Sequence, residues 1–219
     1  MQTSLDTEIK SNNDIKINKD KFGNKKYFYE IYKRILDIIS SLLGLVIGLP
    51  IMVIIAILIK IEDRGPIFYT QERLGKNEKK FLVYKMRSMR VDAEKHGGAQ
   101  WAQKDDPRVT KIGKFIRKTR IDEIPQLFNI LKGDMSLIGP RPERPELTYE
   151  FDKEIPGFIE RLSIKPGLTG LAQVNGGYDI SPKDKLKWDM IYIKNRSILL
   201  DISIVLKTVG VVFTGEGAR

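Results

Sequence analysis

The chain has 219 residues, a formal net charge of +10 and no cysteine. This length fits one domain with appendages and is sufficient to bury a core, while the positive charge indicates an anionic partner such as nucleic acid, anionic lipid or a phosphorylated substrate. The composition excludes disulfides, thiolate metal sites and a cysteine nucleophile, and the single His96 excludes a multi-histidine metal site.

The first 30 residues are polar and rich in Lys, Asn and Asp. Such a composition is typical of a mobile tail, because it offers little apolar surface to bury, and it does not resemble a cleaved signal peptide. We therefore expect a polar tail over residues 1–31.

An apolar segment of 22 residues, residues 38–59, contains no charged side chain. As an unbroken helix it would rise about 33 Å, enough to cross a bilayer core of ~30 Å, so one interpretation is a single-pass anchor. Pro50 argues against a straight helix, because proline lacks an N–H and its ring clashes with the carbonyl four residues earlier. Each half, about 12 residues and ~18 Å long, is too short to span.

The charges on both sides of this segment discriminate between these interpretations. Residues 16–34 contain seven Lys or Arg, and residues 60–80 contain six. Cationic flanks tend to stay on the cytoplasmic side of a membrane. We therefore favour a re-entrant helix over about residues 35–61, broken at Pro50 with both ends on one side, over a straight span or a buried helix of a soluble protein.

The segment Phe81–Met89 predicts a strand. Alternation places Val83, Lys85 and Arg87 on one of its faces. Lys85 and Arg87 would then lie about 7 Å apart, a spacing that suits two oxygens of a diphosphate. An ordinary solvated edge strand is the alternative interpretation.

Two later segments predict further helices. In Arg108–Arg120 the apolar residues share one helical face and cations occupy the rest, so this helix can lie on an anionic membrane surface or belong to a soluble body. Residues Lys183–Phe213 predict two helices with a break near Asn195–Ser197. The second of these fits an interfacial or a core helix.

Two adjacent carboxylates, Asp122 and Glu123, precede a segment with helical periodicity that runs to about Lys132. Pro125 is tolerated only in a first helical turn, so the carboxylates lie at the N-terminus of this helix. They can act simply as capping acids. A helix N-terminus also attracts phosphate, and at a terminus or break both carboxylates can converge on one phosphoryl group or one metal, for which carboxylates favour Mg²⁺.

Arg141 lies between two prolines in the sequence Gly139–Pro142. The restricted backbone suits a fixed guanidinium that binds phosphate in a bidentate manner, because less entropy is lost on contact. A stiff surface turn is the alternative. The glycine-rich segment Lys165–Gly177 lets a ligand approach the backbone closely, but it is not a Walker A loop because it lacks GK[ST].

Several long motifs occur in one order along the chain: YKRILDI…LP, GPIFYTQERLG, KMRSM, GKFIRKTRIDEIPQLFNILKGDMSLIGPRP and KPGLTGLAQVNG. On these motifs the chain from Tyr32 to its C-terminus resembles the small monotopic phosphoglycosyl transferases of bacteria, the bacterial sugar transferase family. One departure is Leu49, because members of the family often carry Ser before the helix-breaking proline.

The resemblance implies a helix-rich α+β fold over residues 32–219. In it, a re-entrant helix-break-helix and interfacial amphipathic helices pack with a small cytosolic α/β catalytic body. It also implies a location at the cytoplasmic face of the bacterial cell membrane, in contact with anionic lipids and without a nucleic-acid partner.

The implied reaction moves a hexose-1-phosphate from a UDP-sugar to undecaprenyl phosphate and releases UMP, as the first membrane step of capsule, exopolysaccharide, O-antigen or glycoprotein glycan assembly. The implied site has Asp122 as nucleophile, Glu123 as metal ligand or base, Mg²⁺ held by both carboxylates, and Arg117, Arg141, Lys85 and Arg87 as phosphate-binding residues. The alternatives are a basic membrane-anchored binding module without catalysis and a transferase that acts on a non-lipid acceptor.

Overall fold

The computed structural model describes residues 23–93, 106–177 and 180–214. The chain divides into two compact units, residues 1–33 and 34–219. Residues 1–22 of the expected tail and His96 lie outside the described residues. Residues 23–31, which we also expected in the tail, are helical, since extending an existing helix requires no new nucleus.

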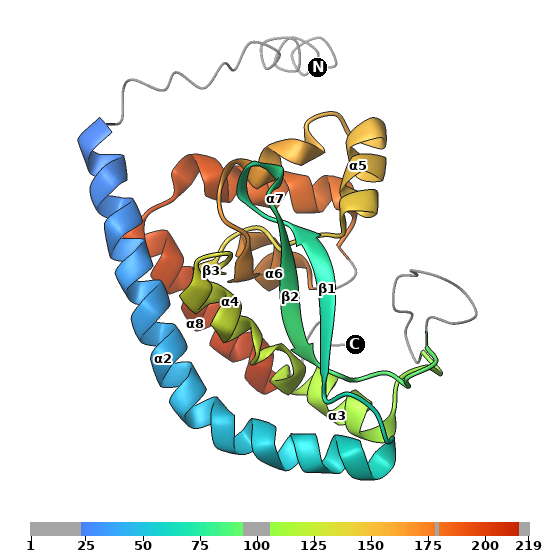
Figure 1. Cartoon of the computed structure of the whole chain (residues 1–219). Coiled ribbons are helices and arrows are strands. Elements are labelled where there is room, and N and C mark those ends of the chain that lie inside the picture. The colour runs from blue at the N-terminus through green and yellow to red at the C-terminus, as the bar shows by residue number, and fades with distance from the viewer. Residues whose placement is uncertain (1–22, 94–105, 178–179, 215–219) are drawn as a thin grey trace. The chain divides into compact units, whose positions relative to one another are not determined.

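The elements follow one another as a long helix, a β-hairpin and a series of shorter helices with two short strands (Figure 1). Their bounds are α2 Gly23–Glu62, β1 Phe68–Leu74, η2 Lys76–Glu78, β2 Lys80–Met86, α3 Lys111–Lys118, η3 Ile121–Glu123, α4 Gln126–Lys132, β3 Ser136–Ile138, α5 Pro145–Glu154, η4 Phe158–Ser163, β4 Gly167–Thr169, α6 Leu171–Gly176, α7 Pro182–Asn195 and α8 Ile198–Thr214. Strands β1 and β2 pair antiparallel, and β3 and β4 pair parallel. The helix-rich α+β class is therefore confirmed.

The helical backbone of α2 runs through Pro50 without the interruption that the sequence predicts. Figure 1 shows the part of α2 in the second unit as curved. A proline inside a helix commonly bends it, because the carbonyl four residues earlier must tilt away from the ring while the remaining hydrogen bonds persist. The helix is bent rather than broken, and by length and composition its segment Tyr27–Glu62 could cross a membrane.

The two faces of α2 in the second unit differ in what covers them. One face contributes Leu45, Met52, Ile55 and Ile59 to a core shared with β2, α3 and α4. The opposite face leaves large apolar side chains exposed, namely Ile39, Leu42, Leu43, Val46, Ile47, Leu49, Val53, Ile54, Ile57 and Ile61. A contiguous apolar surface of this kind marks a contact with membrane or protein, so the helix is compatible with monotopic membrane association.

Two glycines bring α2 close to the segment that follows η3. A Cβ atom on Gly44 would lie 2.8 Å from Leu127 Cδ1, and one on Gly48 would lie 2.7 Å from Ile124 Cγ2. These glycines therefore permit tight packing of α2, which the sequence alone does not reveal.

Polar contacts add to this packing. Arg34 donates hydrogen bonds of 2.6 and 2.7 Å to two carbonyls at the C-terminal end of α4. Asp37 is buried and accepts hydrogen bonds from Ser136 Oγ, at 3.0 Å, and from the backbone N–H of Leu137, at 2.8 Å. The start of the second unit is thus joined to both α4 and β3.

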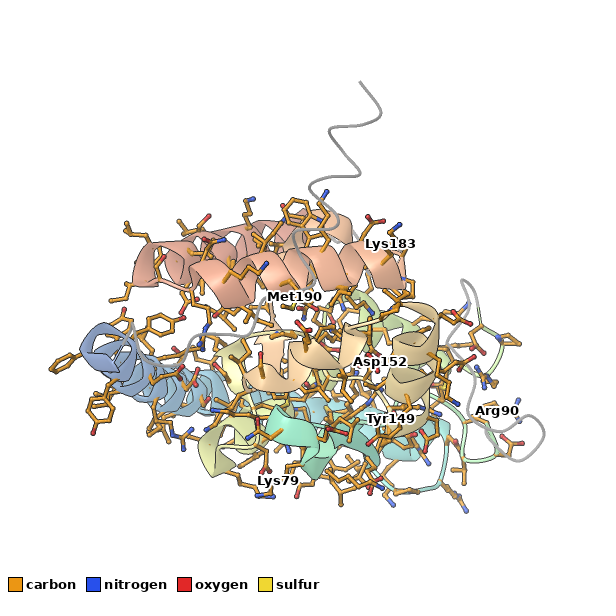
Figure 2. The ribbon with its side chains drawn as sticks, turned by 90° about the horizontal axis from the view of Figure 1, so that it is seen from above. Lys79, Arg90, Tyr149, Asp152, Lys183 and Met190 are labelled. Atoms are coloured by element: carbon orange, nitrogen blue, oxygen red, sulfur yellow. The ribbon has the colours of Figure 1, made fainter. Side chains whose placement is uncertain are left out.

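The C-terminal helices surround a second core, made of Ile138, Ile164, Leu171, Tyr192 and Ile204. The predicted pair of helices with a break near residues 195–197 is confirmed by α7 and α8. Helix α5 packs on β1 and η4, and η4 packs on α7. In Figure 2, α5, marked by Tyr149 and Asp152, accordingly lies between α7, marked by Lys183 and Met190, and the hairpin turn at Lys79.

We predict that Gly48→Ala lowers the stability of the protein relative to Gly210→Ala. Both substitutions replace a helical glycine by alanine, and this replacement stabilises a helix by up to ~1 kcal/mol. Only the first forces a methyl group against Ile124, at an overpacking cost of about 1–3 kcal/mol, because a Cβ at Gly210 meets no atom within 4 Å. Thermal unfolding in detergent measures the difference, and equal midpoints for the two variants would contradict the packing role of Gly48.

Candidate active site

The adjacent carboxylates Asp122 and Glu123 lie in the short turn η3, and both are buried. The turn follows Arg120, whose φ of 59° reverses the chain after α3. Helix α4 has Pro125 at its N-cap and no side-chain capping hydrogen bond. The carboxylates therefore do not act as helix caps, which leaves them available for chemistry.

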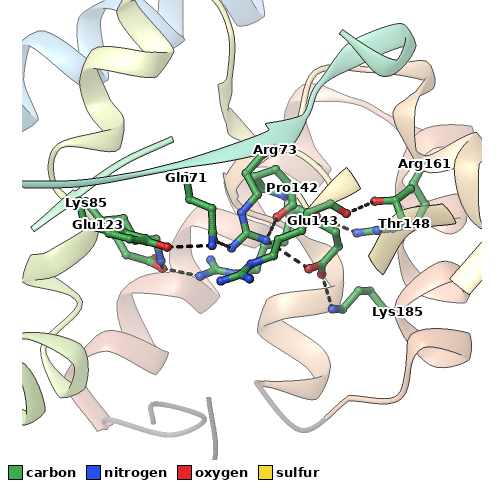
Figure 3. A network of polar contacts seen from close by, with 12 residues as sticks. Gln71, Arg73, Lys85, Glu123, Pro142, Glu143, Thr148, Arg161 and Lys185 are labelled. Atoms are coloured by element: carbon green, nitrogen blue, oxygen red, sulfur yellow. Dashed lines mark hydrogen bonds and ion pairs between the residues drawn. The ribbon is translucent and has the colours of Figure 1, made fainter. Parts of the chain in front are cut away.

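Glu123 is held by two cations. Lys85 Nζ lies 3.0 Å from Glu123 Oε1, and Arg141 Nη2 donates to the same oxygen (Figure 3). Burial alone would raise the pKa of Glu123, but the charges of Arg141 and Lys85 outweigh it and hold the pKa well below its usual range. Glu123 is therefore a fixed anion at neutral pH.

Asp122 has the opposite environment. No hydrogen bond or ion pair to its carboxylate occurs within the described parts of the chain. Burial raises the pKa of Asp122 to about 6; the charge of Lys85 opposes this rise, and the neighbouring Glu123 anion adds to it. Two neighbouring carboxyl groups with divergent pKa values are a recognised arrangement in active sites.

The surrounding cations come from different elements. Lys85 lies on β2 and Arg141 on the loop between β3 and α5, while Arg117, on α3, donates from Nε to Ser88 Oγ at 2.9 Å. The charges of all three lower the pKa of Asp122. The structure thus brings Lys85, Arg117 and Arg141 to the carboxylate pair, as expected, although their binding of phosphate stays a prediction.

Arg87 is not brought to this pair. Its guanidinium is buried, donates to the backbone carbonyl of Asp63 and lies 3.8 Å from the Asp63 carboxylate. The turn between α2 and β1 contacts the chain just after β2. There the backbone N–H of Arg87 donates to the Ile67 carbonyl at 2.8 Å. This turn thus supplies Arg87 with partners away from Glu123, and the shared face of Arg87 and Lys85 stays a prediction.

Carboxylate oxygens are ligands that Mg²⁺ prefers, and binding of Mg²⁺ by this pair stays a prediction. Both cation contacts of Glu123 fall on Oε1, and Asp122 accepts no hydrogen bond from the described residues. Within residues 23–93, 106–177 and 180–214, no cluster of three or more His, Cys, Asp or Glu could hold a metal. A Mg²⁺ ion at two carboxylates takes its remaining ligands from water and substrate phosphate, which is its usual mode of binding.

Sequence reasoning missed two polar residues of α4. Asn129 donates to the Leu82 carbonyl at 2.7 Å and accepts from the Tyr84 N–H at 3.0 Å, so it sets the position of α4 on β2. Gln126 lies one helical turn after Asp122 and is 2% exposed, and its Nε2 has no hydrogen-bond partner in the described part of the chain. Both are polar residues on the buried face of α4. In the sequence they stand among the apolar residues of a predicted helix, and this is the pattern from which a buried polar role could have been predicted.

Comparison with known proteins identifies similar sequences. A family model described as bacterial sugar transferase matches residues 28–215. The chain is 48% identical over 194 residues to the UDP-N-acetylgalactosamine-undecaprenyl-phosphate N-acetylgalactosaminephosphotransferase of Aeromonas hydrophila, with 87% of this chain and 46% of that protein covered. It is 63% identical over 134 residues to a putative undecaprenyl-phosphate N-acetylgalactosaminyl 1-phosphate transferase of Bacillus subtilis, with 61% and 74% covered.

A third relative is the exopolysaccharide production protein PSS of Rhizobium leguminosarum. It is 39% identical over 187 residues, with 82% of this chain and 94% of that protein covered. The chain spans less than half the length of the Aeromonas relative but nearly all of the Rhizobium one. The family model thus covers the part of this chain that contains Asp122 and Glu123.

We predict that Asp122→Asn stabilises the protein above pH 6 and not at pH 4. The pKa of this carboxyl group is 3.8 in the unfolded chain and about 6 in the folded protein. Ionisation therefore lowers the free energy of unfolding as the pH increases through this range, by about 3 kcal/mol in total. The asparagine variant avoids this loss. Unfolding measured between pH 4 and pH 8 gives the difference, with the exposed Asp92→Asn as the control for removal of one charge. A difference independent of pH would show that Asp122 is not held in this way.

Proposed function

The chain belongs to the bacterial sugar transferase family, and we propose that it transfers a sugar-1-phosphate from a UDP-sugar to undecaprenyl phosphate. The observation that carries this proposal is the contrast between Glu123, paired with Lys85 and Arg141, and Asp122, buried beside it without a hydrogen bond from the described residues. Such a carboxylate is suited to attack phosphorus. The relatives that are 48% and 63% identical are named for N-acetylgalactosamine, so UDP-N-acetylgalactosamine is the first donor to test.

The proposed reaction has two steps. An oxygen of the Asp122 carboxylate attacks the sugar-bearing β-phosphorus, the bond from this phosphorus to the bridging oxygen breaks, and UMP leaves with the electron pair. A phosphate oxygen of undecaprenyl phosphate then attacks the same phosphorus and displaces the Asp122 carboxylate. The products are undecaprenyl-diphosphate-sugar and the regenerated enzyme.

Charge repulsion is the main obstacle to the first step, since an anionic carboxylate must approach an anionic diphosphate. With its pKa raised to about 6, Asp122 is ionised at neutral pH and can act as a nucleophile. Arg117, Lys85 and Arg141 reduce the repulsion. Mg²⁺, held by Asp122 and Glu123, would supply further screening of the phosphate charge.

The membrane explains how the two substrates meet. The acceptor has its hydrocarbon chain in the bilayer, whereas the donor is soluble, so they share only the membrane surface. We propose that α2 enters and leaves the cytoplasmic leaflet with its exposed apolar face among the acyl chains. The cationic segments on both sides of it, residues 16–34 and 60–80, support contact with anionic lipids at that face.

The covalent step predicts a mass increase of one sugar phosphate when the protein is incubated with donor alone. Asp122→Asn should abolish this adduct and lower the rate of UMP release at least ~1,000-fold, because it removes the nucleophile. Glu123→Gln should have a smaller effect, and Asp92→Asn should have none. An unchanged mass under conditions where turnover proceeds would contradict the covalent intermediate.

UMP release over a panel of UDP-sugars, with and without undecaprenyl phosphate, tests the activity as a whole. The proposal requires sustained release only with the acceptor present. Absence of release with every donor, together with binding to anionic vesicles that weakens steeply with salt, would instead support a binding module. Sustained release without undecaprenyl phosphate would support a non-lipid acceptor.

A further inference from the structure

A buried arginine lies behind the loop that carries Arg141. Arg161, on η4, is 2% exposed, and its Nε donates to Asp189 Oδ2, on α7, at 2.6 Å. Its Nη2 donates to the backbone carbonyl of Arg141 at 3.0 Å. One guanidinium therefore connects a helix of the second core with the backbone of the candidate active-site loop.

Neighbouring contacts hold the same loop from the side of β1 (Figure 3). Arg73 Nη1 donates to the Pro142 carbonyl at 3.3 Å, and the Leu74 N–H donates to the Glu143 carbonyl at 3.1 Å. The Glu143 carboxylate is itself paired with Lys185 Nζ at 2.6 Å and with Arg73 Nη1 at 3.6 Å. The Pro140 carbonyl accepts from the Gly167 N–H at 2.9 Å, so the carbonyls of four consecutive residues accept hydrogen bonds from outside the loop.

The contact with Arg161 restricts a peptide plane whose orientation the two prolines do not fully set. The rings of Pro140 and Pro142 restrict their own φ angles, and the residue before a proline is confined to extended conformations. The exact orientation of the plane between Arg141 and Pro142 still depends on ψ of Arg141. A hydrogen bond to the carbonyl of Arg141 sets that orientation, and with it the direction from which the side chain reaches Glu123.

Stability alone is a weak reason for the pair of Arg161 and Asp189. Both side chains are buried, and such pairs are often no more stabilising than apolar residues of similar volume, because both charges lose their water. Phe158, whose ring lies 4.5 Å from the Arg161 guanidinium carbon, offers the apolar surroundings that such a replacement would need. The second hydrogen bond, to Arg141, gives the guanidinium a role that an apolar side chain lacks.

We propose that Arg161, held by Asp189, is a positioning residue that fixes the Arg141 guanidinium at the Asp122–Glu123 pair. Arg161 acts through the backbone of Arg141 and does not touch substrate. The inference rests on the proposed function for its kinetic consequences, whereas the orientation of Arg141 can be observed without turnover.

The test is a double-mutant cycle on UMP release by the full chain in detergent or nanodiscs. Arg161→Lys keeps the charge beside Asp189 but loses the planar fork that reaches two acceptors at once. We expect kcat/KM to fall about 10- to 100-fold, as for a misplaced active-site group. In the Arg141→Ala background the same substitution should have less than about a 3-fold effect, because the residue it positions is gone. An equal loss in both backgrounds would overturn the proposal.

One further variant controls for a general loss of structure, and a second tests the pair of Arg161 and Asp189 from the aspartate side. Arg108→Lys weakens a similar arginine–aspartate pair, with Asp106, and should leave kcat/KM unchanged. Asp189→Asn removes the counter-ion of Arg161 but not its bond to Arg141, so it should reduce kcat/KM less than Arg161→Lys and should also lose its effect in the Arg141→Ala background. If Arg161→Lys does not fold, the double-mutant cycle is measured with Asp189→Asn instead. An equal loss of kcat/KM with and without Arg141→Ala would again overturn the proposal.

The orientation of Arg141 has its own readout, the side-chain Nε–H resonance of ¹⁵N-labelled arginine, assigned with Arg141→Ala. Arg161→Lys should shift or broaden this resonance, and Arg108→Lys should not. Absence of UMP release by the wild type would refute the proposed function but leave this measurement valid. A resonance unchanged by Arg161→Lys would refute the positioning role whatever the activity.

Discussion

The double contact of Glu123 with Lys85 and Arg141 is the interaction on which the candidate site depends. It brings together a strand, a 3₁₀ turn and a proline-flanked loop that are distant in the chain. Two adjacent buried carboxylates would otherwise repel each other, and both would tend to take up protons. Lys85 and Arg141 hold the pKa of Glu123 well below its usual range and also oppose the rise of the Asp122 pKa to about 6, so Asp122 is ionised at neutral pH with its oxygens free of hydrogen bonds from the described residues.

Several layers of packing support this contact. Asn129 joins α4 to β2, so the turn with Glu123 lies opposite Lys85. Gly44 and Gly48 allow α2 to pack closely against residues next to that turn. Arg161 and Arg73 hold the loop of Arg141 from the other side. The carboxylate pair is thus supported by the packing of α2 against residues next to the turn and by a buried polar network that holds the loop of Arg141.

Local patterns predicted much of this arrangement. Helical periodicity predicted α3, α4, α7 and α8, and alternation predicted the strand β2, but no local pattern indicated that Lys85 meets Glu123. Local patterns gave the wrong prediction, or none, where a contact with a residue distant in the chain determines the structure. Pro50 breaks isolated helices, but here α2 continues because its inner face packs against α4 and β2. Arg87 pairs with Asp63, 24 residues earlier, and Arg161 contacts residues 20 and 28 positions away, separations that no periodicity encodes.

The inner face of α2 has a consequence for attempts to make this protein soluble. Leu45, Met52, Ile55 and Ile59 belong to the same core as Ile116 and Ile130. Truncation of the apolar helix would therefore remove one wall of this core and expose the side chains of β2, α3 and α4 that pack against it. A detergent or lipid used to extract the protein must therefore preserve the contacts of the inner face of α2.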